Sequence, residues 1–127
     1  MAKVFDASAL LAVVFGEPGA EAAIAHLAEP GCLISAVNWA EVASKMSDQG
    51  APMPQVLSEL AHFGVSVVPL DEDMALAAAA LRGASRKLGL SLGDRCCLAL
   101  ADHLGAEIVT ADKAWARLPG RRCHLIR

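Results

Sequence analysis

Short β-rich runs alternate with helical segments along almost the whole chain. Runs rich in Val, Ile, Leu and Phe predict strands over residues 2–5, 32–34, 65–70, 107–110 and 122–126. Between them, apolar residues recur at helical spacing over 8–15, 20–29, 36–48, 54–63, 71–88, 93–104 and 112–118. Strands joined by helices pair in parallel, so this order predicts an α/β fold, with a mainly parallel central sheet and helices on both faces.

The chain carries enough apolar material for one core. It has 127 residues, of which 55% are hydrophobic and 20% are charged, and we expect a single domain over residues 1–127. The mean hydropathy of +0.44 further predicts that a lone copy exposes apolar surface. A protein partner, or a second copy in a homodimer, would cover that surface.

No segment predicts export or membrane insertion. Lys3 is followed almost at once by Asp6 where a signal peptide would begin its apolar stretch. No apolar run reaches the roughly 20 residues of a membrane span. The four cysteines form no C-x-x-C pair and predict reduced thiols, so we expect a cytoplasmic protein.

Basic residues gather toward the C-terminus. Residues 82–127 carry nine basic and four acidic side chains, whereas residues 1–81 carry two basic and ten acidic ones. Such a basic fringe can attract a polyanion. Solvated helix faces explain it equally well, because the pI near 5.7 lies well below the value of about 9 that marks strongly nucleic-acid-binding domains.

Four carboxylates stand in apolar surroundings. Asp6 ends the first β-rich run, Glu41 lies inside an apolar helical segment, Asp94 opens another, and Asp112 follows the fourth β-rich run. Asp and Glu are rarely buried unless a cation neutralises them. Because Asp6 and Asp112 are expected at the carboxyl ends of parallel strands, where ligands gather, the set predicts a site for Mg²⁺ or Mn²⁺.

Helix capping is the alternative for three of these residues. Asp6, Asp94 and Asp112 all stand near a predicted helix start, where a carboxylate accepts hydrogen bonds from free backbone N–H groups. For any one of them capping is a sufficient explanation. Glu41 lies mid-helix, where a cap cannot explain it, and its apolar neighbours predict a buried environment.

Four motifs resemble, in order, those of the PIN domain. They are Val-Phe-Asp-Ala-Ser-Ala-Leu-Leu at 4–11, Asn-Trp-Ala-Glu-Val at 38–42, Leu-Gly-Asp-Arg-Cys-Cys-Leu-Ala-Leu-Ala at 92–101 and Val-Thr-Ala-Asp-Lys-Ala-Trp at 109–115. The resemblance covers essentially the whole chain. Within that family the chain is most similar to the VapC-type toxin ribonucleases of bacterial toxin–antitoxin pairs, which implies a PIN-like three-layer α/β fold.

The resemblance also implies a function and a set of site residues. Asp6, Glu41, Asp94 and Asp112 match an acidic quartet that binds one or two Mg²⁺ or Mn²⁺ ions. An endoribonuclease of this kind hydrolyses RNA phosphodiester bonds through metal-activated water. Ser8 and Thr110 match hydroxyl residues that support the first and last carboxylates of the quartet.

The expected partners are RNA and an antitoxin. Lys45, Arg86, Arg95 and Lys113 are expected to hold the RNA backbone, because Arg95 and Lys113 directly follow quartet members and the other two lie in nearby helices. The predicted helices at 20–29, 36–48 and 54–63 are poor in charge, so a groove among them could receive an amphipathic helix of the antitoxin. The resemblance implies that a basic side chain of that partner enters the acidic pocket.

Two other functions remain compatible with the sequence. A phosphoacceptor receiver domain has a similar length and also clusters acids around Mg²⁺. Asp71 could accept the phosphoryl group there, but that function needs an acidic pair after the first strand and leaves Glu41 and Asp94 without a role. A non-catalytic PIN-like module that binds RNA or a protein is the other alternative, and cleavage of single-stranded RNA would exclude it.

Overall fold

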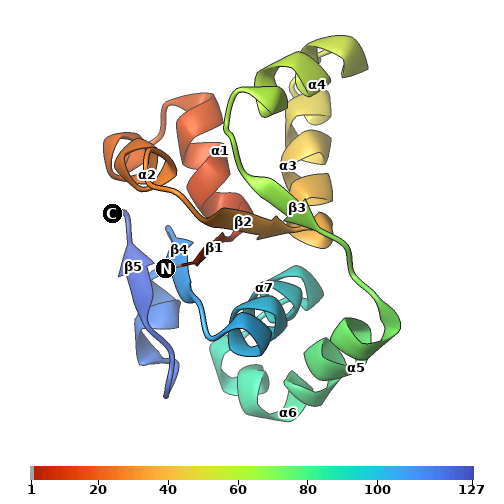
Figure 1. The fold of residues 1–127 in the computed structure, drawn as a ribbon, viewed down its shortest axis with the longest axis vertical. Helices are drawn as coiled ribbons and strands as arrows, with labels where there is room; N and C mark the ends of the chain where they lie inside the picture. The colour runs from red at the N-terminus through yellow and green to blue at the C-terminus, as the bar shows by residue number, and fades with distance from the viewer. Residues whose placement is uncertain (1) are drawn as a thin grey trace.

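A five-stranded parallel sheet forms the centre of the molecule (Figure 1). The computed structural model describes residues 2–127. Its strands are β1 (Lys3–Phe5), β2 (Cys32–Ser35), β3 (Ser66–Val68), β4 (Glu107–Thr110) and β5 (Cys123–Leu125). They lie in the order β3-β2-β1-β4-β5, and every neighbouring pair is parallel. The predicted parallel sheet is confirmed.

Helices cover both faces of this sheet (Figure 1). On one side lie α1 (Ala7–Phe15), α2 (Ala20–Leu27), α3 (Ala36–Asp48) and α4 (Met53–Ala61). On the other side lie α5 (Glu72–Ala80), α6 (Arg82–Ser85) and α7 (Leu92–Leu104). Two 3-10 helices, η1 (Arg86–Leu88) and η2 (Lys113–Arg117), complete the fold. The three-layer α/β architecture expected from the sequence is therefore present.

Alternate residues of the central strands supply two cores. Phe5 on β1, Ile34 on β2 and Val109 on β4 pack with α1, α3 and α4. Their neighbours Val4 and Ile108 pack with α7 and η2 on the opposite face. Since successive side chains of a strand point to opposite faces, β1 is buried along its whole length and its carboxyl end is held rigidly in the sheet.

The segment predicted as one helix over residues 71–88 is helical for most of its length but is interrupted in its second half. In the structure α5 stops at Ala80, and α6 and η1 follow as separate short turns. The Ala78 carbonyl, which a continuous helix would pair with the N–H four residues on, accepts instead from the Leu81 N–H and from the guanidinium of Arg95. A side chain from α7 thus binds the carbonyl at the end of α5.

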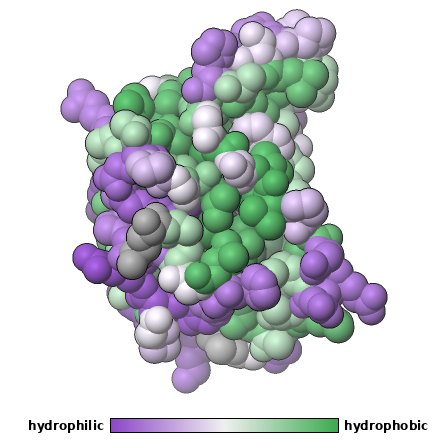
Figure 2. Space-filling model, viewed as in Figure 1, coloured by the Kyte–Doolittle hydropathy of each residue, from purple (hydrophilic) through white to green (hydrophobic). Residues whose placement is uncertain are grey.

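The third strand is shorter than predicted. β3 ends at Val68 rather than Leu70, because Pro69 has no N–H to donate to a neighbouring strand. β3 is an edge strand, and Val67 within it and Leu70 just after it are exposed. Apolar surface extends over this edge in Figure 2, as expected for a chain with high mean hydropathy.

Within residues 2–127, no single helix has the length and apolar composition to cross a bilayer. Helices α1 and α2 would meet that composition only if taken together, and the chain bends by 112° between them.

Candidate functional site

Asp6 lies at the carboxyl end of the central strand, where α1 begins. Its side chain is buried and caps α1 by accepting from the Ala9 N–H at 2.9 Å. Two hydroxyls also donate to this carboxylate, Ser8 Oγ at 2.7 Å to Oδ1 and Thr110 Oγ1 at 2.5 Å to Oδ2. The structure thus places both predicted supporting residues in direct contact with Asp6.

Burial makes the negative charge of Asp6 unfavourable. Loss of hydration raises the pKa of this carboxyl to about 6, and repulsion from Asp94 acts in the same direction. The hydrogen bonds from Thr110, Ser8 and Ala9 favour the charged form and offset part of this effect. No ion pair formed within residues 2–127 includes Asp6, so the charge has no cationic side chain to balance it.

Asp94 lies in the first turn of α7, close enough to this buried carboxylate to contribute to its raised pKa. Its Oδ2 accepts from the Ser91 N–H at 2.9 Å, and its own N–H donates to Ser91 Oγ at 3.1 Å, forming a capping box. Burial raises the pKa of the Cys97 thiol one turn further along, and the charges of Asp6, Asp94 and Glu41 add to that rise. These three carboxylates therefore share one neighbourhood.

Glu41 reaches that neighbourhood from α3. Its Oε1 accepts from Asn38 Nδ2 at 2.8 Å, and its carboxylate occupies the space that a Cβ atom on Gly93 would need. The buried environment predicted for Glu41 is wrong, because the side chain is exposed. Asn38, Val42 and Met46 form the buried face of α3, and residue 41 lies outside that stripe.

Asp112 completes the quartet with a different geometry. Its side chain is exposed and caps η2 by accepting from the Ala114 N–H at 2.9 Å. Its backbone N–H donates to Thr110 Oγ1 at 3.0 Å, and that hydroxyl donates in turn to Asp6. Asp112 is thus linked to Asp6 through one hydroxyl, while its carboxylate faces a helix N-terminus.

The helix caps that the sequence offers as an alternative are all present, at Asp6, Asp94 and Asp112. Across residues 2–127, no three Asp, Glu, His or Cys side chains converge closely enough to hold a metal ion as they stand. The donor set nevertheless fits a hard divalent cation. It consists of carboxylate oxygens only, and its buried member is repelled by a second carboxylate without any balancing cation. The residues that would hold the ion are Asp6, Asp94, Glu41 and Asp112.

Three of the four basic residues expected at the RNA backbone are exposed. Lys45 follows Glu41 by one helical turn, Lys113 directly follows Asp112, and Arg86 lies on η1. Arg95 is buried, and its Nη1 donates to the Ala78 carbonyl at 3.2 Å. Arg95 faces α5 rather than the surface of the site, so we remove it from the expected RNA contacts.

Asn38 is the site residue that the sequence reasoning missed. Its Nδ2 donates to Glu41 and also to the Gly93 carbonyl at 3.1 Å. The available signal was its position three residues before Glu41, a spacing that brings two side chains together on a helix. Asp71, which a receiver domain would use, lies beyond edge strand β3 and caps α5 through the Met74 N–H.

Comparison with known proteins identifies the family. The PIN domain model matches residues 3–121. The VapC ribonuclease Mb2780c of Mycobacterium bovis and the ribonuclease VapC42 of Mycobacterium tuberculosis are each 32% identical to this chain over 114 residues, which cover 84% of the chain and 87% of either relative.

Solved structures share the fold. A toxin–antitoxin complex from Klebsiella pneumoniae matches with a TM-score of 0.78 and 24% identity, covering 99% of this chain and 98% of the other. VapBC2 from Rickettsia felis, bound to a promoter DNA fragment, matches with a TM-score of 0.76 and 17% identity, covering 98% of each chain. The VapC20 toxin of Mycobacterium tuberculosis, which cleaves the sarcin–ricin loop, matches with a TM-score of 0.74 and 16% identity over 91% of this chain and 93% of that one. On its motifs, its fold and its relatives, the chain belongs to the PIN-domain family and, within it, to the VapC group.

Proposed function

We propose that this protein is a metal-dependent endoribonuclease and the toxin of a toxin–antitoxin pair. The observation that carries the proposal is Asp6, a buried carboxylate without a cationic partner among residues 2–127 that is repelled by Asp94 at the carboxyl end of the central strand. A fold keeps such an unfavourable charge when a ligand uses it. The related VapC ribonucleases are the reason for choosing RNA as the substrate.

The chain itself prepares and orients the carboxylates. Ser8, Thr110 and Ala9 donate to Asp6 and hold it in one orientation, whereas the Ser91 N–H holds Asp94. When bound, Mg²⁺ or Mn²⁺ would supply Lewis acidity and an activated water for phosphodiester hydrolysis. Without the ion the pKa of Asp6 is about 6, so an ion must compete with a proton below that pH, and the apparent affinity for the ion should rise as the pH rises through 6.

Exposed basic residues beside the quartet supply the contacts for RNA. Lys45 on α3 and Lys113 on η2 stand next to Glu41 and Asp112, and neither forms an ion pair within residues 2–127. Their ammonium groups can therefore contact phosphates on either side of the scissile bond. Arg86 on η1 can contact a further phosphate of the same RNA.

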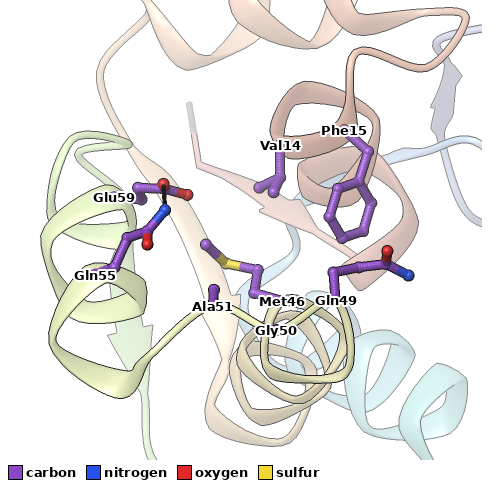
Figure 3. Close-up of a pocket in the computed structure, with 8 residues that line it drawn as sticks. All are labelled: Val14, Phe15, Met46, Gln49, Gly50, Ala51, Gln55 and Glu59. Atoms are coloured by element: carbon purple, nitrogen blue, oxygen red, sulfur yellow. Dashed lines mark hydrogen bonds between the residues drawn. The ribbon is translucent and has the colours of Figure 1, made fainter.

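A groove at the far end of α3 fits the antitoxin. Its cavity, of about 300 Å³, lies between the C-terminal ends of α1 and α3 and one face of α4 (Figure 3). Val14, Phe15 and Met46 give it an apolar wall, and Gln55 and Glu59, joined by a 2.9 Å hydrogen bond, form its polar rim. The sequence predicted α2 beside α3 and α4 here. The structure corrects this, because α1 lines the cavity instead.

This groove and the acidic site share one helix. Met46 lies five residues after Glu41 on α3, a rise of roughly 7.5 Å. Those five residues also turn the helix by about 140°, so an amphipathic helix whose apolar side chain fills the groove would cross over α3 to bring an Arg or Lys to the carboxylates. Such a residue would be attracted by the charges that hold the ion, so inhibition should weaken when salt is raised.

The test is cleavage of a fluorescently labelled single-stranded RNA by the purified chain. We expect cleavage with Mg²⁺ or Mn²⁺, products that carry a 5′ phosphate, and no cleavage in EDTA. Undiminished cleavage in EDTA would contradict metal dependence. In cells, expression alone should arrest growth and coexpression of the neighbouring gene should relieve the arrest, whereas a harmless protein would argue for a nuclease outside a toxin–antitoxin pair.

A further inference from the structure

Asn38 joins two helices of the proposed metal site. Its side chain is almost fully buried in α3, with 1% of its surface exposed. The Nδ2 group donates to Glu41 Oε1 at 2.8 Å and to the Gly93 carbonyl at 3.1 Å. One amide thus connects a candidate metal ligand on α3 to the first turn of α7, which carries Asp94.

Stability alone does not account for an asparagine here. Its Oδ1 is buried and finds no donor among residues 2–127, and a buried acceptor without a partner weakens a fold. Neither of the two groups that accept from Nδ2 needs Asn38 as its hydrogen-bond donor. The Gly93 carbonyl lies inside α7, where it faces the helical N–H four residues on, and Glu41 is open to solvent. An apolar side chain would satisfy the packing without leaving an orphaned oxygen.

Gly93 leaves space for the same carboxylate. A Cβ atom built on this residue would overlap the Glu41 carboxylate, with Oε1 as its nearest neighbour. Gly93 is helical and has no positive φ, so backbone conformation does not require glycine at this position. The glycine leaves room for Glu41 to lie against the turn that carries Asp94.

We propose that Asn38 is a positioning residue of the metal site, which together with Gly93 holds the Glu41 carboxylate beside Asp94 before an ion binds. The proposal rests on the proposed function. An exposed Glu side chain samples many rotamers and loses that freedom when it ligates an ion. Because Asn38 already restricts the Glu41 side chain in the ion-free protein, less rotamer freedom is lost when the ion binds. Asn38 itself does not contact the ion. Outer contacts of this kind typically change metal affinity or activity by about 10–100-fold.

The direct test is a Mn²⁺ titration of the full chain without RNA, in which electron paramagnetic resonance measures the free ion. Asn38→Ala removes the donor, and Gly93→Ala displaces the flexible end of Glu41 without a backbone clash. We expect each variant to bind Mn²⁺ about 10-fold more weakly. Gly83→Ala is the matched control, because a Cβ on that helical glycine meets nothing within 4 Å, and its affinity should equal that of the wild type.

A double-mutant cycle separates positioning from general structure. If Asn38 acts through Glu41, then Asn38→Ala should have little further effect on Mn²⁺ affinity in a Glu41→Ala background, which has no side-chain oxygen to accept from Asn38. Cleavage by Asn38→Ala should recover at saturating Mn²⁺, because only ion binding is weakened. Thermal unfolding should show that Asn38→Ala is folded, and Gly93→Ala carries the test if it is not.

The outcomes distinguish the two proposals. Unchanged Mn²⁺ affinity in both Asn38→Ala and Gly93→Ala, or fully additive effects in the cycle, would overturn the role of Asn38 and leave the metal site standing. Weakened, non-additive binding in a protein that cleaves no RNA would support the role of Asn38 and overturn the nuclease. A wild-type protein that binds no Mn²⁺ would overturn both.

Discussion

Replacing Asp6 with asparagine should stabilise the protein at neutral pH. A pKa raised from 3.8 to about 6 corresponds to roughly 3 kcal/mol, at about 1.4 kcal/mol for each pH unit. Because the folded state binds this proton more tightly than the unfolded state, the free energy of unfolding falls as the pH rises from about 4 to 6, and stays low above that. The asparagine side chain cannot ionise, so the free energy of unfolding of Asp6→Asn should not show this decrease with pH.

The size of the effect follows from the contacts that the variant keeps. The asparagine oxygen can still accept from the Ala9 N–H, but one of the hydroxyls of Ser8 and Thr110 must turn to accept from the new amide. The lost hydrogen bond offsets about 1 kcal/mol of the roughly 3 kcal/mol gain. We therefore expect the free energy of unfolding of Asp6→Asn to exceed that of the wild type by about 2 kcal/mol at pH 7.5. That advantage should shrink by roughly 2 kcal/mol at pH 4.5.

Urea unfolding in EDTA, followed by tryptophan fluorescence at both pH values, measures this difference. Asp112→Asn is the matched control, because this exposed cap keeps its function as asparagine and should show no such gain. Added Mn²⁺ should stabilise the wild type and not Asp6→Asn. An Asp6→Asn variant that is less stable than the wild type at pH 7.5, or a difference that does not change with pH, would refute the reasoning.

Three further predictions concern catalysis, RNA and the partner. Asp94→Asn should lower RNA cleavage by more than about 100-fold with unchanged circular dichroism, and near-normal cleavage would remove Asp94 from the site. Lys113→Gln should reduce the salt slope of RNA binding by about 0.7. Arg95→Met should leave that slope unchanged, since Arg95 is buried against α5, and filter binding at several salt concentrations measures the slope of each variant. Ala51→Trp, which fills the groove, should weaken antitoxin binding by at least about 10-fold without affecting cleavage, and Ala79→Trp on α5 is the control; equal calorimetric affinities would place the antitoxin elsewhere.

The sheet and its carboxyl-end carboxylates were predictable from the sequence because their signals are local. Alternating strand and helix patterns determine a parallel sheet, and Asp6 follows the first strand directly. Errors arose where a distant side chain decides the outcome. At the break after α5 the Ala78 carbonyl accepts from Arg95, 17 residues away, whereas the local alanine-rich sequence favours one continuous helix.

Helical phase explains the remaining differences at the site. Arg95 follows a quartet member directly in sequence, but one residue along a helix turns the side chain by about 100°, toward α5. Glu41 has apolar neighbours in sequence, yet the buried stripe of α3 passes through residues 38, 42 and 46. Adjacency along the chain therefore overstated the exposure of Arg95 and the burial of Glu41.

Anomalous diffraction from a crystal soaked with Mn²⁺ tests the metal site most directly. We predict a peak about 2.1 Å from carboxylate oxygens of Asp6 and Asp94, with Glu41 or Asp112 completing the ligands. Asp94 Oδ2 and Asp112 Oδ1 accept from the N–H groups of Ser91 and Ala114 without the ion, which would leave Asp94 Oδ1 and Asp112 Oδ2 to bind it. A well-ordered crystal with no peak at these residues, or with Mn²⁺ bound only elsewhere on the chain, would contradict the proposed metal site.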